Sequence, residues 1–186
     1  MKINAKSNLQ TVALAVAEAL ENAGIHAVLT GGACATIHTA GRYASEDVDF
    51  VLKSASSQKK LDDAMAGLGF RRHRDQYFHP QTRFFVEFPS GPLGIGRDLS
   101  IKPVRKRIGP SGAAVRILSA TDSCRDRLAA FYHWNDRQSL SVAVSIALKN
   151  RVEINRIRAW SAREGASERF AEFTQELARA RKPRRP

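Results

Sequence analysis

Two aspartates with a spacing of two are the first residues of this sequence that point to chemistry. Asp47 and Asp49 lie in the run DVDFVL, whose alternation of acidic and apolar residues is typical of a strand with one buried face. Side chains alternate along a strand, so both carboxylates point to one face while Val48 and Phe50 point into the core. Two such carboxylates raise each other's pKa unless a cation lies between them. The pair therefore predicts a divalent metal site.

A third carboxylate, Glu87, interrupts the apolar run FFVEF, which is another strand candidate. An ionised side chain among large apolar residues needs a partner, and a neighbouring metal ion would supply one. Three carboxylates on adjacent strands can hold two Mg²⁺ ions about 3.5–4 Å apart, an arrangement that stabilises the attacking and leaving oxygens of nucleotidyl transfer. We therefore take Asp47, Asp49 and Glu87 as candidate catalytic residues and metal ligands, with Mg²⁺ as the expected metal and Mn²⁺ as its substitute.

A glycine pair, Gly31-Gly32, separates the apolar run IHAVLT from ACATIHTA, in a pattern of strand, glycines and helix. Because glycine has no Cβ, backbone amides at this turn can approach phosphate oxygens, and the helix N-terminus adds partial positive charge. Taken singly, the glycines fit an ordinary turn, the aspartates fit a surface loop and the glutamate fits a solvent-facing strand position. Their order along the chain favours the metal site over these alternatives.

The elements that must position these residues fall into two groups. In the first part of the chain the patterns predict helices over 9–24 and 56–68, a short helix after the glycines, and strands over 25–30, 47–52, 70–74, 82–88 and 115–118. In the second part they predict a helix from residue 121 and further helices over 136–149, 153–163 and 167–180. Mixed elements followed by helices alone indicate an α+β fold with an all-α addition.

We expect two domains and a tail. An α/β domain is placed at residues 1–118, a helical domain at 119–178, and a basic, disordered tail at 179–186. The segment between Pro89 and Gly112 is rich in glycine and proline and is the one credible linker; its length fits an irregular excursion as well as a domain boundary.

The charge of the chain is unevenly distributed. Thirty Lys and Arg against 18 Asp and Glu give a formal charge of +12. Residues 1–96 hold ten basic and nine acidic side chains, whereas residues 97–186 hold twenty and nine. Such an excess is either a solvated surface or a binding face for a nucleotide triphosphate or nucleic acid. Since the carboxylates lie in the nearly neutral half, we interpret the basic half as the part that binds an acceptor.

Composition also excludes several classes of protein. With 43% hydrophobic residues the chain has enough apolar material for an ordinary core. No apolar run approaches the roughly 20 residues of a membrane span, and the N-terminus lacks a signal-peptide core, so we expect no membrane association and a cytoplasmic location. Cys34 and Cys124 have no metal or disulfide-framework spacing and are expected to be buried. The five histidines share no metal-ligand spacing.

Two stretches resemble a known family. LTGGACATIHTAGRYASEDVDFVL resembles the Gly-Gly/Gly-Ser and DxD signature of the nucleotidyltransferase fold of the DNA polymerase β-like superfamily. The likeness is strongest to the minimal bacterial branch that includes AbiEii-type toxins. ILSATDSCRDRLAAFYHWNDRQSL is similar to a helical segment of that branch in which a basic residue precedes Leu-Ala-Ala and an acidic residue follows. Arg127 takes the basic position and Asp136 the acidic one, nine residues later.

The resemblance implies roles for these positions. Asp47 and Asp49 would ligate Mg²⁺, and Glu87 would act as a third ligand or as the base that activates the acceptor hydroxyl. The residues implied to bind the nucleotide triphosphate are Gly31, Gly32, Ser45, Arg127 and Asp136.

The residues and the resemblance together predict a Mg²⁺-dependent enzyme that transfers NMP from an NTP to an acceptor hydroxyl. The expected acceptor is RNA, such as a tRNA 3′ end, or a protein, and the expected setting is a toxin–antitoxin or abortive-infection system with an antitoxin protein as partner. Two alternatives remain. Arg127 stands where the branch often has Lys, which suggests a non-catalytic binding or regulatory protein of this fold. A basic nucleic-acid-binding protein explains the charge but leaves the three carboxylates unaccounted for.

Overall fold

The computed structural model describes residues 2–41, 43, 45–54, 56–107 and 114–182. Its helices are α1 (Leu9–Asn22), α2 (Gly31–His38), α3 (Gln58–Gly67), α4 (Ala120–Trp134), α5 (Arg137–Lys149), α6 (Ile154–Arg163) and α7 (Ser167–Arg181). Its strands are β1 (Ala27–Leu29), β2 (Asp47–Leu52), β3 (Arg71–His73), β4 (Gln76–Phe78), β5 (Phe85–Glu87), β6 (Val104–Arg107) and β7 (Ala114–Ile117).

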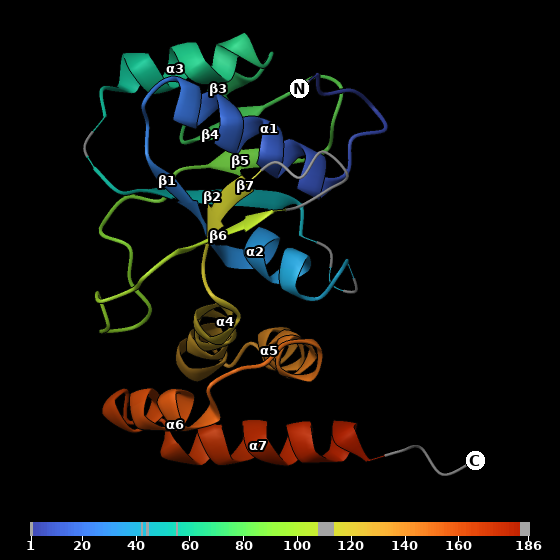
Figure 1. Ribbon diagram of the computed structural model, residues 1–186, viewed down its shortest axis with the longest axis vertical. Coiled ribbons are helices and arrows are strands. Elements are labelled where there is room, and N and C mark those ends of the chain that lie inside the picture. The colour runs from blue at the N-terminus through green and yellow to red at the C-terminus, as the bar shows by residue number, and fades with distance from the viewer. Residues whose placement is uncertain (1, 42, 44, 55, 108–113, 183–186) are drawn as a thin grey trace.

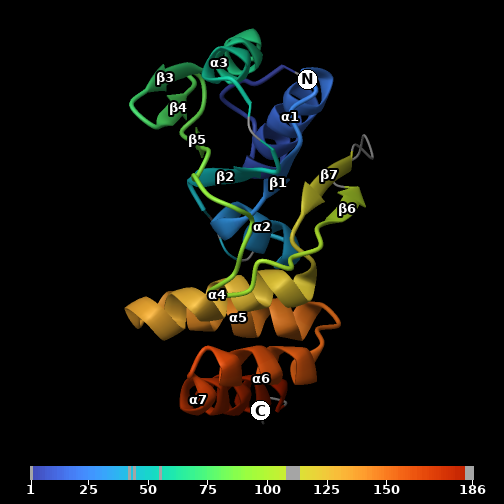
Figure 2. The same cartoon turned by 90° about the vertical axis from the view of Figure 1, so that its left-hand side faces the viewer.

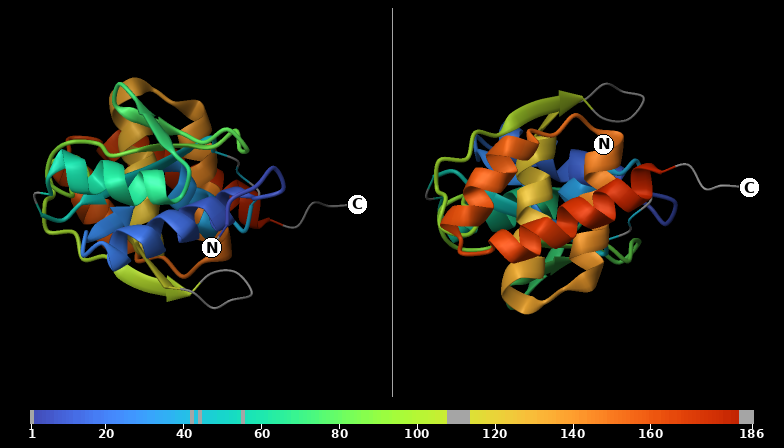
Figure 3. Two further views of the ribbon diagram at one scale, coloured as in Figure 1. Left: turned by 90° about the horizontal axis from the view of Figure 1, so that it is seen from above. Right: turned by 90° about the horizontal axis from the view of Figure 1, so that it is seen from below.

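The described strands form one mixed sheet in the order β3-β4-β5-β2-β1-β7-β6. Helices α1 and α3 lie on one side of this sheet and α2 lies on the other (Figure 1). Below α2 come α4 and α5, and below them α6 and α7, so the chain is built in layers (Figure 2). Seen from below, α7 crosses the helical layer (Figure 3). The predicted α+β architecture with a C-terminal helical part is confirmed.

Local sequence signals explain the elements nearest the carboxylates. Helix α1 begins where the Asn8 side chain accepts a hydrogen bond from the Thr11 amide, and it buries its apolar face against β1 and β7. Strand β2 has the predicted bounds and the predicted alternation, because Val48 and Phe50 are buried while the two aspartates are half-buried. The strands of residues 70–88 were predicted less accurately.

The region after α3 contains three short strands where two were predicted. Strands β3 and β4 form a hairpin, and Arg74 has the positive φ of 54° that its tight turn requires. Strand β5 then pairs antiparallel with β4 and parallel with β2. The prediction of one strand over 82–88 was therefore too long, and β4 was missed. Three-residue strands give too little alternation to be recognised in a sequence.

The glycine- and proline-rich stretch predicted as a linker is held against the helical part. We call residues 94–98 the strap. The Trp160 indole donates a hydrogen bond to the Ile95 carbonyl at 3.3 Å, and the Arg97 amide donates to Glu164 Oε1 at 2.9 Å. The strap is thus an ordered excursion. Strand β6, which follows it, lies at the edge of the sheet, and it was not predicted because its sequence VRKR is mostly charged.

A buried arginine completes the attachment of the strap. The Arg125 side chain is 1% exposed and donates hydrogen bonds to Asp122 at 2.8 Å and to Asp98 at 2.5 Å. Its guanidinium carbon lies 4.9 Å from the centroid of the Trp160 ring. The hydrogen bond from Arg125 lowers the pKa of Asp98 to about 2. Asp98 of the strap is therefore tied to α4 by charge, and the same arginine packs on Trp160 of α6.

Replacing Arg125 by Met is expected to lower the free energy of unfolding by about 3–5 kcal/mol, because two carboxylates lose their buried partner. Urea unfolding at pH 7 measures the change. Arg179→Met breaks the exposed pair with Glu176 and should cost about 0–1 kcal/mol. The folded Asp98 titrates below its unfolded value, so its contribution is present above about pH 4 and disappears as the pH falls towards 2. Equal losses in the two variants would contradict this account of the strap.

The structure also bears on the predicted C-terminal tail, the two cysteines and the helices. Helix α7 continues through Arg181, so the first residues of the predicted disordered tail are helical, and residues 183–186 lie outside the described part. Cys34 and Cys124 are buried free thiols, as expected. Within the described ranges, no helix combines the length and apolar character that a membrane span requires.

Candidate nucleotidyl-transfer site

The parallel pairing of β2 and β5 places all three predicted carboxylates on one face of the sheet. Asp49 is the Cα partner of Glu87, and Asp47 is the partner of Phe85. Paired residues of neighbouring strands point to the same side, so Asp47, Asp49 and Glu87 share a face. The Phe85 amide also donates to the Glu46 carbonyl at 3.2 Å, which extends this register to the start of β2. The prediction that the carboxylates lie on adjacent strands is confirmed.

Asp49 shows how strongly these charges interact. Burial, followed by the neighbouring charges of Asp47 and Glu87, raises the pKa of Asp49 to about 7. Arg127, which comes from α4, acts in the opposite direction. Carboxylate oxygens are the ligands that a hard divalent cation such as Mg²⁺ prefers, and a cation between them would relieve their repulsion. The residues present therefore fit the predicted metal.

The glycine pair forms the start of α2 and lies directly against the aspartates. We expected Gly31 and Gly32 in the turn before the helix, whereas they are its first two residues, after Thr30 as the N-cap. Gly31 has a φ of 61°, and a Cβ there would overlap Asp49 Oδ2. A Cβ on Gly32 would overlap the Ser45 hydroxyl. Only glycine lets the helix N-terminus approach the DxD strand so closely.

Two backbone and side-chain contacts fix the aspartates in place. The Thr30 amide donates to the Asp49 carbonyl at 2.9 Å, which joins the N-cap of α2 to β2. The Ser45 hydroxyl donates to Asp47 Oδ1. Ser45 is buried and in this structure orients an aspartate, while its implied contact with a phosphate stays a prediction.

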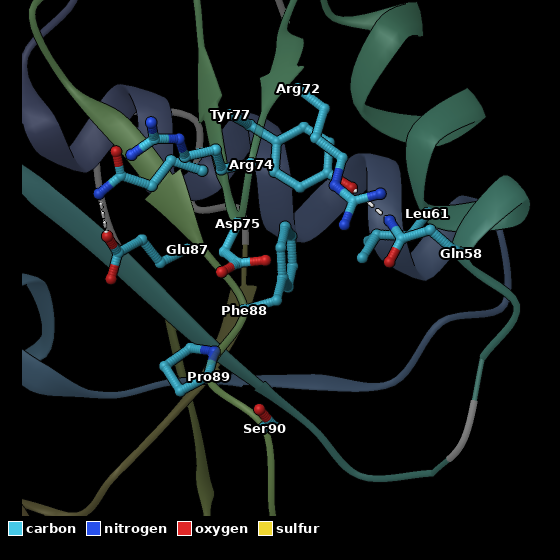
Figure 4. A pocket seen from close by; sticks show the side chains of 11 residues that line it. Gln58, Leu61, Arg72, Arg74, Asp75, Tyr77, Glu87, Phe88, Pro89 and Ser90 are labelled. Carbon is cyan, nitrogen blue, oxygen red and sulfur yellow. Dashed lines mark hydrogen bonds between the residues drawn. The ribbon is translucent and has the colours of Figure 1, made fainter.

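The Glu87 carboxylate is hydrogen-bonded to the neighbouring strand β4. Its Oε1 atom accepts a hydrogen bond from the Gln76 amide, drawn as the dashed line at Glu87 in Figure 4. Among the described residues, no three His, Cys, Asp or Glu side chains converge as a ready metal cluster. Asp47 and Asp49 therefore form the core of the candidate site, and Glu87, whose Oε1 atom is engaged by Gln76, stays the predicted third ligand.

The two helical residues implied by the resemblance lie in different settings. Arg127 is electrostatically coupled to Asp49 and donates to Asp126 at 2.7 and 3.1 Å. Asp136 is the N-cap of α5: it accepts from the amides of Gln138 and Ser139 and from the Ser139 hydroxyl at 2.6 Å. These hydrogen bonds lower the pKa of Asp136. Its acidity has a structural explanation in capping, and its implied contact with a nucleotide stays a prediction.

Sequence reasoning missed a cleft that adjoins Glu87. The cleft has a volume of about 540 Å³ and lies between α3, the β3–β4 hairpin and the end of β5 (Figure 4). Arg74 lies on the side of Glu87, whereas Arg72 lies beside Tyr77, whose hydroxyl donates to Asp62 at 2.6 Å. The run RRHRDQY was the available signal, but only the hairpin pairing brings two of its arginines, Arg72 and Arg74, to the cleft.

The sheet, the glycine-led helix and the strand aspartates together define a nucleotidyltransferase fold, which solved structures share. One is an antigenic nucleotidyltransferase-like protein from Paracoccidioides brasiliensis, which is 20% identical, covers 76% of either chain and has a TM-score of 0.55. Another is the antibiotic-resistance factor ANT(2'')-Ia, which is 13% identical, with 89% of this chain and 99% of that chain covered and a TM-score of 0.51. No family model and no curated protein sequence matches the chain. The structural similarity confirms the fold, while the finer resemblance to the AbiEii branch stays a prediction.

Without metal, the protein is expected to lose stability as the pH rises from about 4 to about 7. In this range the folded state keeps Asp49 protonated, with a pKa of about 7, whereas in the unfolded chain Asp49 has the ordinary pKa of an aspartate and is ionised. Mg²⁺ should raise the melting temperature more at pH 8 than at pH 5, where protons compete for the same oxygens. Thermal unfolding with EDTA or Mg²⁺ measures both effects. Asp49→Asn isolates this carboxyl from the other titrating groups, and a Mg²⁺ shift that is equal at the two pH values would contradict the assignment.

Proposed function

We propose that this protein is a Mg²⁺-dependent nucleotidyltransferase that moves NMP from an NTP to an acceptor hydroxyl and releases pyrophosphate. The observation that carries the proposal is the packing of the Gly31-Gly32 helix start against the Asp47 and Asp49 pair. A helix start offers amides without intrahelical partners and partial positive charge to phosphates, and the adjacent carboxylates offer oxygen ligands to a cation. Phosphate-binding and metal-binding groups thus meet at one place.

Each side chain then has a stated task. Asp47 and Asp49 would hold Mg²⁺, with Glu87 as third ligand, and Mn²⁺ would substitute. The bound metal would neutralise charge on the triphosphate. Arg127, whose guanidinium stays charged, would bind a phosphate, and the amides of Gly31 and Gly32 would hold another.

The transfer itself needs a deprotonated acceptor. In this step the acceptor oxygen forms a bond to the α-phosphorus, and the bond from the α-phosphorus to pyrophosphate breaks. The acceptor proton would pass to Glu87 when that residue serves as the general base. Its hydrogen bond with Gln76 orients the carboxylate until the acceptor arrives.

The acceptor we propose is RNA, with a tRNA 3′ end as the leading example, and the role is that of a toxin restrained by an antitoxin protein. The support is the net basic charge of the second half of the chain and the resemblance to AbiEii-type toxins. Protein is the alternative acceptor.

A second candidate function is binding or regulation without catalysis. It is favoured by two contacts: Glu87 is engaged by Gln76, and Arg127 is engaged by Asp126. Calorimetric titration with NTP and Mg²⁺ separates the candidates, because tight binding that depends on the metal is expected of the enzyme.

Isotope transfer tests the proposed reaction directly. Each NTP, labelled on the α-phosphate, is incubated with the protein, Mg²⁺ and either total RNA or cell protein. The proposal expects α-label on RNA and release of pyrophosphate. A parallel reaction with γ-labelled NTP should leave RNA unlabelled, since γ-label on the acceptor would indicate a kinase, and no label from either nucleotide would contradict the enzyme.

A further inference from the structure

The carboxylates belong to a wider pattern on one sheet face. Across β2, β5, β4 and β3 the pairing places side chains in two parallel rows. We call the part of this face carried by β3, β4 and β5 the open face. The row that starts at Asp47 continues through Phe85, Phe78 and Arg71, and the row that starts at Asp49 continues through Glu87, Gln76 and His73.

The open face carries aromatic rings that the core does not use. The centroids of Phe78 and Phe85 lie 5.6 Å apart, with 30° between the ring planes, and Phe78 is 41% exposed. On the opposite face of the same strands, Tyr77 and Val86 are buried and the sheet is covered by α3. The strands therefore have their core on one side and present two adjacent rings on the other.

The rings and the residues proposed to bind the nucleotide lie on different sides of β2. Gly31 and α2 lie on the β1 side of β2, whereas the open face lies on its β5 side. The carboxylates therefore separate two surfaces, one suited to a triphosphate and one bearing rings. Adjacent strands lie about 4.7–4.9 Å apart, so Phe85 and Phe78 lie one and two strand spacings from Asp47. A transfer between two substrates requires two adjoining sites, and these two surfaces could supply them.

We propose that the open face binds the single-stranded end of an RNA acceptor, with a base stacked on Phe78 and Phe85 and a phosphate held by Arg71. This inference rests on the proposed nucleotidyl transfer and names the surface that presents its second substrate. Aromatic rings that stack bases beside a cation for the backbone are the means by which proteins bind single strands. The exposed arginines of the β3–β4 hairpin, Arg71, Arg72 and Arg74, supply local positive charge for a polyanion in this nearly neutral half of the chain, and the basic second half complements the rest of the RNA.

Binding of a fluorescently labelled single-stranded RNA to the full chain tests the open face. Phe78→Ala is expected to weaken binding by about 5- to 150-fold, as loss of one stacked base does. Phe78→Tyr keeps a ring at this position and should retain binding. The matched control is Leu148→Ala, which truncates an apolar residue of 44% exposure on α5 and should leave RNA affinity unchanged. Melting temperatures of all variants separate lost binding from lost folding.

The salt dependence tests the arginine separately. Arg71→Ala should reduce the slope of log affinity against log salt concentration by about 0.7, the value for one phosphate contact on a single strand. Lys60→Ala, which truncates an exposed lysine of α3 in the nearly neutral half of the chain, is the control and should retain the slope.

The outcomes distinguish this inference from the proposed function. Equal RNA affinity in the wild type and Phe78→Ala, or equal loss in Phe78→Ala and Leu148→Ala, would overturn the open face as the RNA site. Transfer of α-label to protein in place of RNA would overturn it as well. NTP binding with Mg²⁺ is titrated in parallel on the wild-type protein, and its absence would count against nucleotidyl transfer while the RNA titration still decides the role of Phe78.

Discussion

Replacing Asp47 and Asp49 together by Asn is expected to reduce transfer of α-label to at most about a thousandth of the wild-type rate. Metal-held charge stabilisation is worth several kcal/mol, and each 1.36 kcal/mol is a factor of about ten in rate. Amide groups keep the shape of the two side chains but remove the negative charge that binds the cation. Initial rates of label incorporation at saturating NTP and Mg²⁺ provide the measurement.

The same double variant is expected to be at least as stable as the wild type in chelated buffer at pH 8. The substitution removes the repulsion that raises the pKa of Asp49, so the fold loses an unfavourable contribution. Asp63→Asn is the control, because Asp63 is an exposed acid of α3 paired with Lys59 at 2.7 Å and should keep full activity. Unchanged turnover in the double variant would remove the proposed mechanism, and a collapse of stability would show that the pair serves the fold.

Gly31→Ala is expected to lower the transfer rate by about 100-fold or more, the size of effect that a displacement of about 1 Å produces in an active site. The new Cβ would overlap Asp49 Oδ2, so either the aspartate or the start of α2 must move. The positive φ of 61° adds a backbone cost of about 1–3 kcal/mol. Transfer kinetics and thermal unfolding of the purified variant measure the two effects.

Gly41→Ala separates these two contributions. Gly41 has a φ of 78°, so it carries a similar backbone cost, but no described atom lies within 4 Å of its Cβ position. We expect Gly41→Ala to lose stability and to keep its activity. If the two variants lost activity equally, the close approach of Gly31 to Asp49 would have no catalytic meaning.

The features that sequence reasoning predicted are those that depend on neighbouring residues in the chain. Strand β2 could be recognised because six residues alternate between carboxylate and apolar side chains, and α1 because its apolar residues recur at helical spacing. Cys34 and Cys124 follow the general preference of free cysteines for the interior.

The features that were missed depend on pairings between distant segments. The contact of Gln76 with Glu87 and the rows of the open face exist only once β4 lies beside β5, and no local pattern specifies that register. Likewise the strap is ordered by Trp160 and Arg125, which follow it by many residues. The N-cap role of Asp136 was also missed, although it depends on local sequence alone. An Asp directly before a predicted helix is a capping signal that was available in the sequence.

The strap links the part of the chain that forms the sheet to the C-terminal helices. It leaves the sheet soon after Glu87 and is bonded to α4 and α6, while Arg127, the cation coupled to Asp49, also comes from α4. A fragment ending at residue 118 would keep the three carboxylates but lose that cation and the bonding partners of the strap. We therefore expect a fragment ending at the predicted boundary to lack a cation of the proposed triphosphate site, and activity measured on such a fragment against the full chain checks this.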